Sequence, residues 1–324
     1  MTTAVATKPS TDAIGRRRWA TLTAKYGVYG GIVVLIVVNV FVSTDFISLS
    51  NLRVQLYQAV PVLIVALGMA LVIGTEGIDL SVGAIIALSS AILPLYLGYG
   101  VWVSIALAIV AGGVAGLISG SLVAFARVQP IVATLAMMIG LRGLAVIMNG
   151  ATAKPIDDMT LLNLGLTGWL SLPTMAYVAV VLVAIVAFVM RRTTLGRNLV
   201  AVGDNPSASF LSGLPVRRIL LAVYIASGML AAIAGILIAG HGAYADPANY
   251  GLNYELLAIT AVVVGGTPLS GGQVRVIGTV AGTIFMQLVT ATLVQNNVKN
   301  SYAQMIEAVI ICIAVFVARE SANR

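Results

Sequence analysis

The chain has 324 residues, of which 60% are hydrophobic and only 9% are charged. A water-soluble domain of this composition would expose a continuous apolar surface, so the composition excludes that class. The apolar runs are unbroken rather than alternating, which favours an all-α polytopic membrane protein over a β-barrel.

The net charge of +7 does not indicate a nucleic-acid partner, because the basic residues stand at the ends of apolar runs, as membrane topology determinants do. The single cysteine, Cys312, provides neither an intrachain disulfide nor a metal site. Residues 1–18 are polar and basic, and no small-residue cleavage site follows the next apolar run. Residues 1–26 are therefore predicted to be a cytoplasmic tail before a retained first span.

Hydrophobic segments along the chain predict about ten transmembrane helices in one domain, residues 27–318, followed by a short cytoplasmic tail, 319–324. Several match the ~20 residues that cross ~30 Å of hydrocarbon. The second, third and eighth are short or interrupted by Gly and Pro, which predicts that they lie inside protein or beside a water-filled path. The segments are 27–43, 57–74, 80–97, 101–126, 130–149, 174–190, 219–240, 255–267, 275–294 and 302–318.

The distribution of positive charge predicts the orientation. With the N-terminus in the cytoplasm, 14 of the 18 Lys and Arg residues lie in inside segments. Arg53, Lys154 and Lys299 lie outside, and Arg142 falls within a span. Both termini are therefore predicted to be cytoplasmic.

Glycines recur every four positions in two segments, at Gly112, Gly116 and Gly120 and again at Gly278 and Gly282. Small residues at this spacing let helix backbones approach closely in a membrane. The pattern favours packing within the chain over a dimer seam.

The stretch "GTEGIDLSVG" (74–83) places Glu76 and Asp79 between two apolar segments. Three interpretations stay open. Asp79 or Ser81 could cap the helix that follows, the two acids could line a polar crevice between broken helices, or they could form a proton relay.

Arg142 lies over halfway along its span, where a charge is costly. The sequence predicts a buried acid as its partner (Asp79, Glu76 or Glu255) in a structural pair rather than a substrate contact. Glu255 opens the eighth segment as a helix N-terminal acid, and His241 is predicted to cap a helix C-terminus rather than to bind a metal.

Tyrosines gather in the predicted outer loop 241–254, at Tyr244, Tyr250 and Tyr254. With Trp102 and Trp169 they fit an interfacial aromatic belt. Alternatively, Tyr244 and Tyr250 form a docking surface for a partner protein.

The loop 191–218 is the longest predicted cytoplasmic link. Asn205 suits a helix N-cap, Pro206 the first helical position, and Gly213 the position after the last turn. We therefore predict a helix of about two turns over 206–212, either a docking element or part of a solvated loop.

Four motifs in order resemble permease subunits of bacterial ABC sugar importers of the ribose, xylose and galactofuranose type, within the branched-chain amino acid/ribose permease superfamily. They are "GIDLSVGA" (77–84), "QPIVATLAMM" with "RGLA" (129–145), "TLGRNLVAVGDNPSASFLSGL" (194–214) and "ELLAITAVVVGGTPLSGG" with "GTVAG" (255–282). Together they span nearly the whole chain. The outer loop 241–254 shows the least resemblance.

The resemblance implies a bacterial inner-membrane permease, not an enzyme, that imports a monosaccharide. It implies three protein partners: an ABC ATPase, a second identical or different permease subunit, and a soluble sugar-binding protein. The chain has no G-x-x-x-x-G-K-[ST], so the partner ATPase would bind ATP and Mg²⁺. The residues implied to couple to that ATPase are Gly196, Arg197, Gly203, Asn205, Pro206, Ser207, Ala208, Ser209 and Gly213.

Two alternatives stay open: a branched-chain amino-acid permease of the same superfamily, and a stand-alone ion-coupled secondary transporter. The second would not need an ATPase and would depend on its carboxylates. A membrane-embedded enzyme lacks support, because the sequence shows no catalytic grouping of residues.

Overall fold

The computed structural model describes residues 11–42, 46–166, 168–169, 172–296, 298–299, 301–302, 304–306, 308–310 and 312. About half of the tenth predicted segment, 302–318, lies outside these residues, as do residues 1–10 of the predicted N-terminal tail and the whole predicted C-terminal tail. The helices are α1 (Thr11–Val42), α2 (Leu49–Gly74), α3 (Val82–Tyr96), η1 (Leu97–Tyr99), α4 (Val101–Ala124), α5 (Pro130–Asn149), α6 (Met159–Leu166), α7 (Thr174–Arg192), α8 (Thr194–Asp204), α9 (Pro206–Leu211), α10 (Val216–Gly242), α11 (Tyr254–Val264) and α12 (Val276–Gln295).

Two short antiparallel pairs are the only sheet structure in the described residues. β1 (Lys154–Pro155) pairs with β4 (Tyr244–Ala245), and β2 (Gly168–Trp169) pairs with β3 (Leu172–Pro173). The predicted all-α class is confirmed.

Seven of the described helices are long and apolar enough to cross a membrane: α2, α3 with η1, α4, α5, α7, α10 and α12. Two shorter apolar helices, Gly27–Val42 and α11, correspond to the first and eighth predicted segments. At ~1.5 Å per residue, α11 spans about 16 Å, half of the hydrocarbon layer. The short eighth segment is therefore confirmed.

The second segment is longer than its hydropathy indicated. α2 begins at Leu49 rather than near residue 57, with Ser48 Oγ accepting the Asn51 N–H at 3.2 Å. Polar side chains in its first turns hid this start. Gln55 and Gln58 accept hydrogen bonds from Gln287 of α12, both at 2.8 Å. An amide that is satisfied by a neighbouring helix can lie in a membrane helix.

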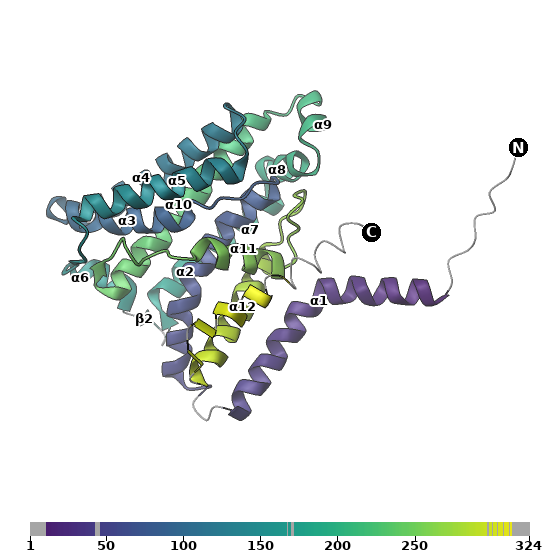
Figure 1. The fold of residues 1–324 in the computed structure, drawn as a ribbon, viewed down its shortest axis with the longest axis horizontal. Coiled ribbons are helices and arrows are strands. Elements are labelled where there is room, and N and C mark those ends of the chain that lie inside the picture. Colours follow the sequence, from purple (N-terminus) through teal and green to yellow (C-terminus); the bar gives the residue numbers. More distant parts are fainter. Residues whose placement is uncertain are drawn as a thin grey trace, which may run out of the picture.

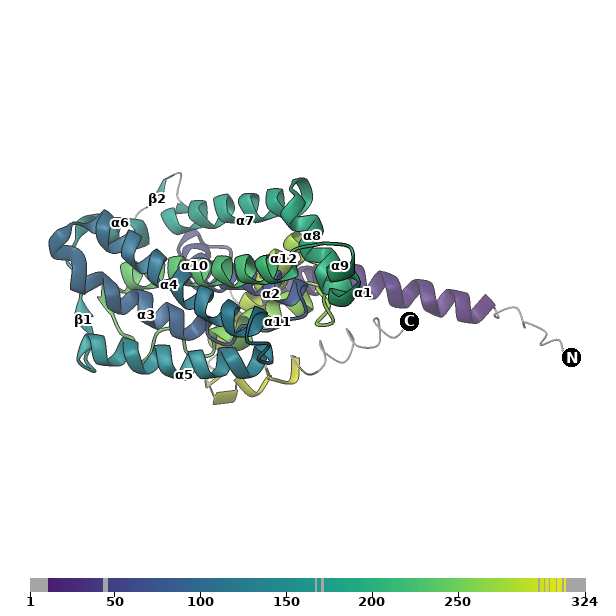
Figure 2. The same cartoon turned by 90° about the horizontal axis from the view of Figure 1, so that it is seen from above.

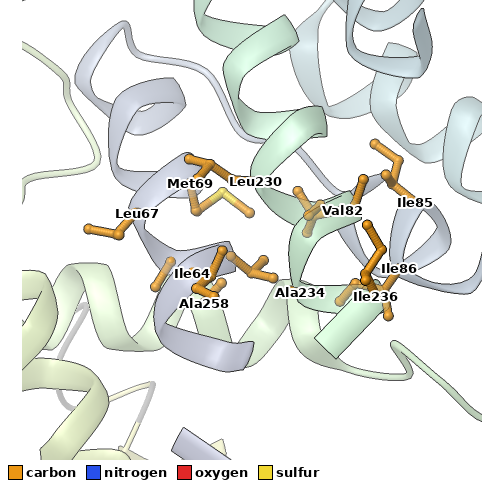
Figure 3. Close-up of a cluster of buried hydrophobic side chains, with 14 of the residues drawn as sticks. Ile64, Leu67, Met69, Val82, Ile85, Ile86, Leu230, Ala234, Ile236 and Ala258 are labelled. Atoms are coloured by element: carbon orange, nitrogen blue, oxygen red, sulfur yellow. The ribbon is translucent and has the colours of Figure 1, made fainter. Parts of the chain in front are cut away.

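The core forms around α2, α3 and α10. α10 packs on α4, α2 and α3, while α5 and α7 lie at the margin and bury only 17% of their spanning residues. Figures 1 and 2 show α10 among α2, α3 and α4. In Figure 3 apolar side chains of four helices converge, among them Met69 of α2, Ile86 of α3, Leu230 of α10 and Ala258 of α11. The prediction that the second and third segments are shielded inside protein is confirmed.

Glycines allow α4 and α10 to cross in backbone contact. A Cβ atom at Gly112 would lie 2.6 Å from the Cβ of Ala232, and one at Gly116 would collide with the carbonyl oxygen of Tyr224. Gly228 of α10 meets the Gly112 carbonyl from the other side. Gly278 and Gly282 of α12 approach α11 in the same way. The predicted packing within the chain is confirmed.

We expect Gly116→Ala to lower the thermal midpoint of the detergent-solubilised protein, because overpacking costs about 1–3 kcal/mol where backbone faces the new methyl group. Gly140→Ala is the matched control, since a Cβ there meets nothing within 4 Å. It should raise the midpoint slightly through helix propensity. Equal shifts in the two variants would contradict the close crossing.

Candidate functional site

A buried carboxylate connects the turn between α2 and α3 to α10. Asp79 Oδ1 accepts the Ser81 N–H at 3.1 Å and the Ser81 hydroxyl at 2.6 Å. Asp79 Oδ2 accepts the hydroxyl of Ser227 in α10 at 2.9 Å. The side chain is fully buried, so these three donors replace the water that an exposed carboxylate would bind. Asp79 therefore holds the turn to the centre of α10.

Two of the three interpretations of this turn can be compared with the structure, and the proton relay stays a prediction. Ser81 occupies the N-cap position of α3, but its side chain makes no capping bond, so the Ser81 cap is wrong. Asp79 binds the amide just before the helix, close to the predicted cap. Because Asp79 is 0% exposed, it lines no open crevice in this conformation. Glu76 is exposed and lies apart, beside Gly271.

Two residues of α10 belong to this site and were missed at the sequence level. Ser227 binds Asp79, and the buried Tyr224 interacts with it electrostatically. The Tyr224 hydroxyl lies 2.8 Å from the Cβ position of Gly77, and it has no hydrogen-bond partner in the described part of the chain. The sequence signal that could have identified them is that Tyr224 and Ser227 are polar, lie three positions apart and therefore share one face of an apolar helix.

Arg142 of α5 holds the segment that leads from α10 to α11. Its guanidinium donates to the carbonyl oxygens of Pro247 at 3.3 Å and Tyr250 at 3.2 Å. Asn149 of the same helix donates to Ala245 at 3.0 Å. Among the three predicted acids, Glu255 is the one that interacts electrostatically with Arg142. The pairing prediction thus misses the main partners, which are backbone carbonyls.

Glu255 lies in the first turn of α11, as predicted. A Cβ atom at Gly83 of α3 would meet both the Glu255 carboxylate and the Gly251 carbonyl, so only glycine fits there. Tyr244 and Tyr250 lie together, with ring centroids 5.4 Å apart, and Tyr244 is exposed. His241 is in the last turn of α10 and stacks on Tyr57. No group of three potential metal ligands occurs in the residues that were described.

The loop 191–218 forms two helices. Asn205 Oδ1 accepts the Ala208 N–H at 2.8 Å, Pro206 is the first residue of α9, and Gly213 has φ +81°. The predicted short helix is confirmed, ending at Leu211. α8 was not predicted. Its signals are a Thr193 cap that accepts the Gly196 N–H at 3.3 Å, and an apolar face containing Leu199 and Val202.

The predicted coupling residues divide into exposed and buried sets. Gly196 and Gly203 are buried, as is Ser209, which donates to the Ala201 carbonyl at 2.9 Å and joins α9 to α8. Phe210 is 69% and Leu211 85% exposed. Phe210 and Leu211 were not among the predicted coupling residues. Together with the exposed predicted residues they form what we name the α8–α9 surface: Arg197, Asn205, Pro206, Ser207, Ala208, Phe210, Leu211 and Gly213.

A buried carboxylate between broken helices, together with this exposed helical element, fits a transport protein rather than an enzyme. The family described as "Branched-chain amino acid transport system / permease component" matches residues 51–315. The chain belongs to this family. It is a multi-pass inner-membrane protein and a translocation subunit, and permease subunits of this kind carry no cofactor of their own.

Curated relatives resemble the chain over most of its length. A ribose import permease protein of Escherichia coli is 36% identical over 294 residues, which is 88% of this chain and 91% of the relative. A fructose import permease protein of Bifidobacterium longum is 34% identical, covering 87% and 83%. A galactofuranose transporter permease protein of E. coli is 36% identical, covering 80% and 77%. No solved structure matches.

We expect Ser227→Ala to destabilise the protein by about 1–3 kcal/mol, because one oxygen of the buried Asp79 loses its donor. Ser119→Ala is the matched control, since the Ser119 hydroxyl is also buried but has no partner in the described residues. Thermal unfolding in detergent measures both. Together with Asp79→Asn, the effect of Ser227→Ala should be less than additive. Equal melting of the two alanine variants would contradict the tie between Asp79 and α10.

Proposed function

We propose that the chain is the membrane-spanning permease of a binding-protein-dependent ABC importer for a monosaccharide. The observation that carries this proposal is the similarity to sugar import permeases over nearly the whole chain. Relatives for different sugars lie at similar identities, 36% for ribose and galactofuranose and 34% for fructose. Identity alone therefore does not select the sugar.

The α8–α9 surface is the proposed docking site for the ATPase, which binds ATP and Mg²⁺. Phe210 and Leu211 project apolar side chains from a helix that is fixed by the Asn205 cap. Exposed apolar residues on a rigid element are typical anchors of a protein contact. Arg191 and Arg192 at the end of α7 and Arg197 of α8 are exposed and add positive charge to the same loop. In this arrangement the α9 end is cytoplasmic, as are both termini.

The opposite side of the molecule is the proposed site for the sugar-binding protein. Tyr244 and Tyr250 lie on a segment that is fixed by β1, by Arg142 and by Asn149. Because this segment is already held in place by three contacts, binding of a partner would not cost the entropy of ordering it. A second permease subunit would complete the pathway, surrounded by membrane lipid.

Reconstitution tests the function. We expect proteoliposomes that contain this chain and its ATPase to hydrolyse ATP faster when the binding protein is added with its sugar. The panel is D-ribose, D-fructose, L-arabinose and D-galactofuranose, with L-leucine testing the amino-acid alternative. Stimulation by leucine alone, or uptake by the permease without any ATPase, would contradict the proposal.

Crosslinking tests the docking site. In a Cys312→Ser background, we expect a thiol crosslinker to join Ser207→Cys to the ATPase, because Ser207 is exposed. Ser209→Cys is the matched control two residues away and should react little, since Ser209 is 6% exposed. Capture through Ser209→Cys but not Ser207→Cys would show that α9 docks through another face.

A further inference from the structure

Three parts of the chain that are distant in sequence meet beside α8. They are the end of α2 at Gly74, the last turn of α8 at Gly203, and the turn between α11 and α12 at Gly271 and Gly272. The Gly272 N–H donates to the Gly74 carbonyl at 3.1 Å. We call these four residues the glycine joint.

Gly203 makes the closest contact in the joint. A Cβ atom there would collide with the Gly74 carbonyl oxygen and lie 2.7 Å from the Gly272 nitrogen. A Cβ at Gly271 would lie 2.7 Å from the Gly203 oxygen and 3.0 Å from the Glu76 nitrogen. Every one of these neighbours is backbone. A side chain at Gly203 could therefore be accommodated only if α8 moved away from the other two segments.

The joint also needs glycine for its backbone conformation and is closely packed. Gly271 and Gly272 both have φ +74°, a left-handed conformation that other residues rarely adopt. The side chains of Leu199 and Val274 close over Gly74 from α8 and from the turn. Leu199 is buried, so apolar packing as well as backbone contact holds α8 in place.

Through α2 the joint leads to Asp79. After Gly74 the chain makes a tight turn, in which the Glu76 N–H donates to the Ile73 carbonyl at 2.9 Å and the Gly77 N–H to the Val72 carbonyl at 3.1 Å. Asp79 follows and binds Ser227 of α10. The covalent route from α9 to α10 is different, because Gly213 there is exposed and a Cβ would meet nothing within 4 Å.

We propose that the glycine joint transmits a displacement of α8 and α9 to the end of α2 and to the turn between α11 and α12. Gly203 is the positioning residue of the joint. α8, the end of α2 and the α11–α12 turn move as one body, and Asp79 carries the displacement to α10. The proposal rests on the proposed function, because the force comes from the docked ATPase. It adds the path by which that force enters the membrane domain.

The test compares Gly203→Ala with wild type in the reconstituted importer. We expect the ATPase still to bind, since no residue of the α8–α9 surface is substituted. Stimulation of ATP hydrolysis by the sugar-loaded binding protein should fall by about fivefold or more, as coupling energies between sites are typically worth 5–150-fold. Gly30→Ala in α1 is the control, because a Cβ there meets nothing within 4 Å. Normal stimulation in a folded, assembled Gly203→Ala importer would overturn the proposal.

A double-cysteine variant tests the proposal if Gly203→Ala does not fold. Leu199→Cys and Val274→Cys, in the Cys312→Ser background, are joined by a short reducible crosslinker. If α8 and the α11–α12 turn move as one body, the crosslinked importer should still be stimulated in ATP hydrolysis by the sugar-loaded binding protein. If crosslinking abolishes stimulation and reduction restores it, the parts slide past each other and the proposal fails. If the wild-type importer responds to no sugar, the proposed function itself fails, and this inference with it.

Discussion

Close contact between helix backbones is the constraint on which the rest of this structure depends. Lipid offers apolar side chains an environment as favourable as another helix, so helices associate through packing at short range rather than through the hydrophobic effect. Here α4 crosses α10 at Gly112 and Gly116, and α11 meets α12 at Gly265 and Gly278. Such crossings bring helices close enough for buried polar groups to find partners on neighbouring segments.

Several polar side chains within the membrane domain bind segments that are distant in sequence. Asp79 binds Ser227, Arg142 binds the Tyr250 carbonyl, and Gln287 binds two glutamines of α2. An unpaired polar group costs several kcal/mol in hydrocarbon, so each pair also specifies which helices are neighbours. The polar residues of this chain thus contribute specificity where apolar packing alone would leave alternatives.

The same arrangement suits a subunit whose helices are displaced by a partner protein. α3 and α11 start or stop within the bundle, where their ends meet glycine-rich turns instead of solvent. Such ends can shift as units without exposing a full helix to lipid. In the proposed importer, the α8–α9 surface receives the ATPase, and the bundle responds at these ends.

The sequence by itself determined the class of protein, most of the helices and the short capped helix near Pro206, because composition, run length and cap chemistry are local properties. It also indicated the internal use of the glycine repeats. The sequence did not reveal α8, because an amphipathic helix contains enough polar residues to resemble a loop. It also did not reveal the true start of α2, because the glutamines in its first turns resemble a polar link between spans. Only the tertiary structure decided that Asp79 binds α10, that Arg142 binds backbone carbonyls, and that Glu76 and Asp79 separate. The physical reason is that a buried polar group takes whichever partner folding brings within reach, and spacing along one chain does not encode that distance.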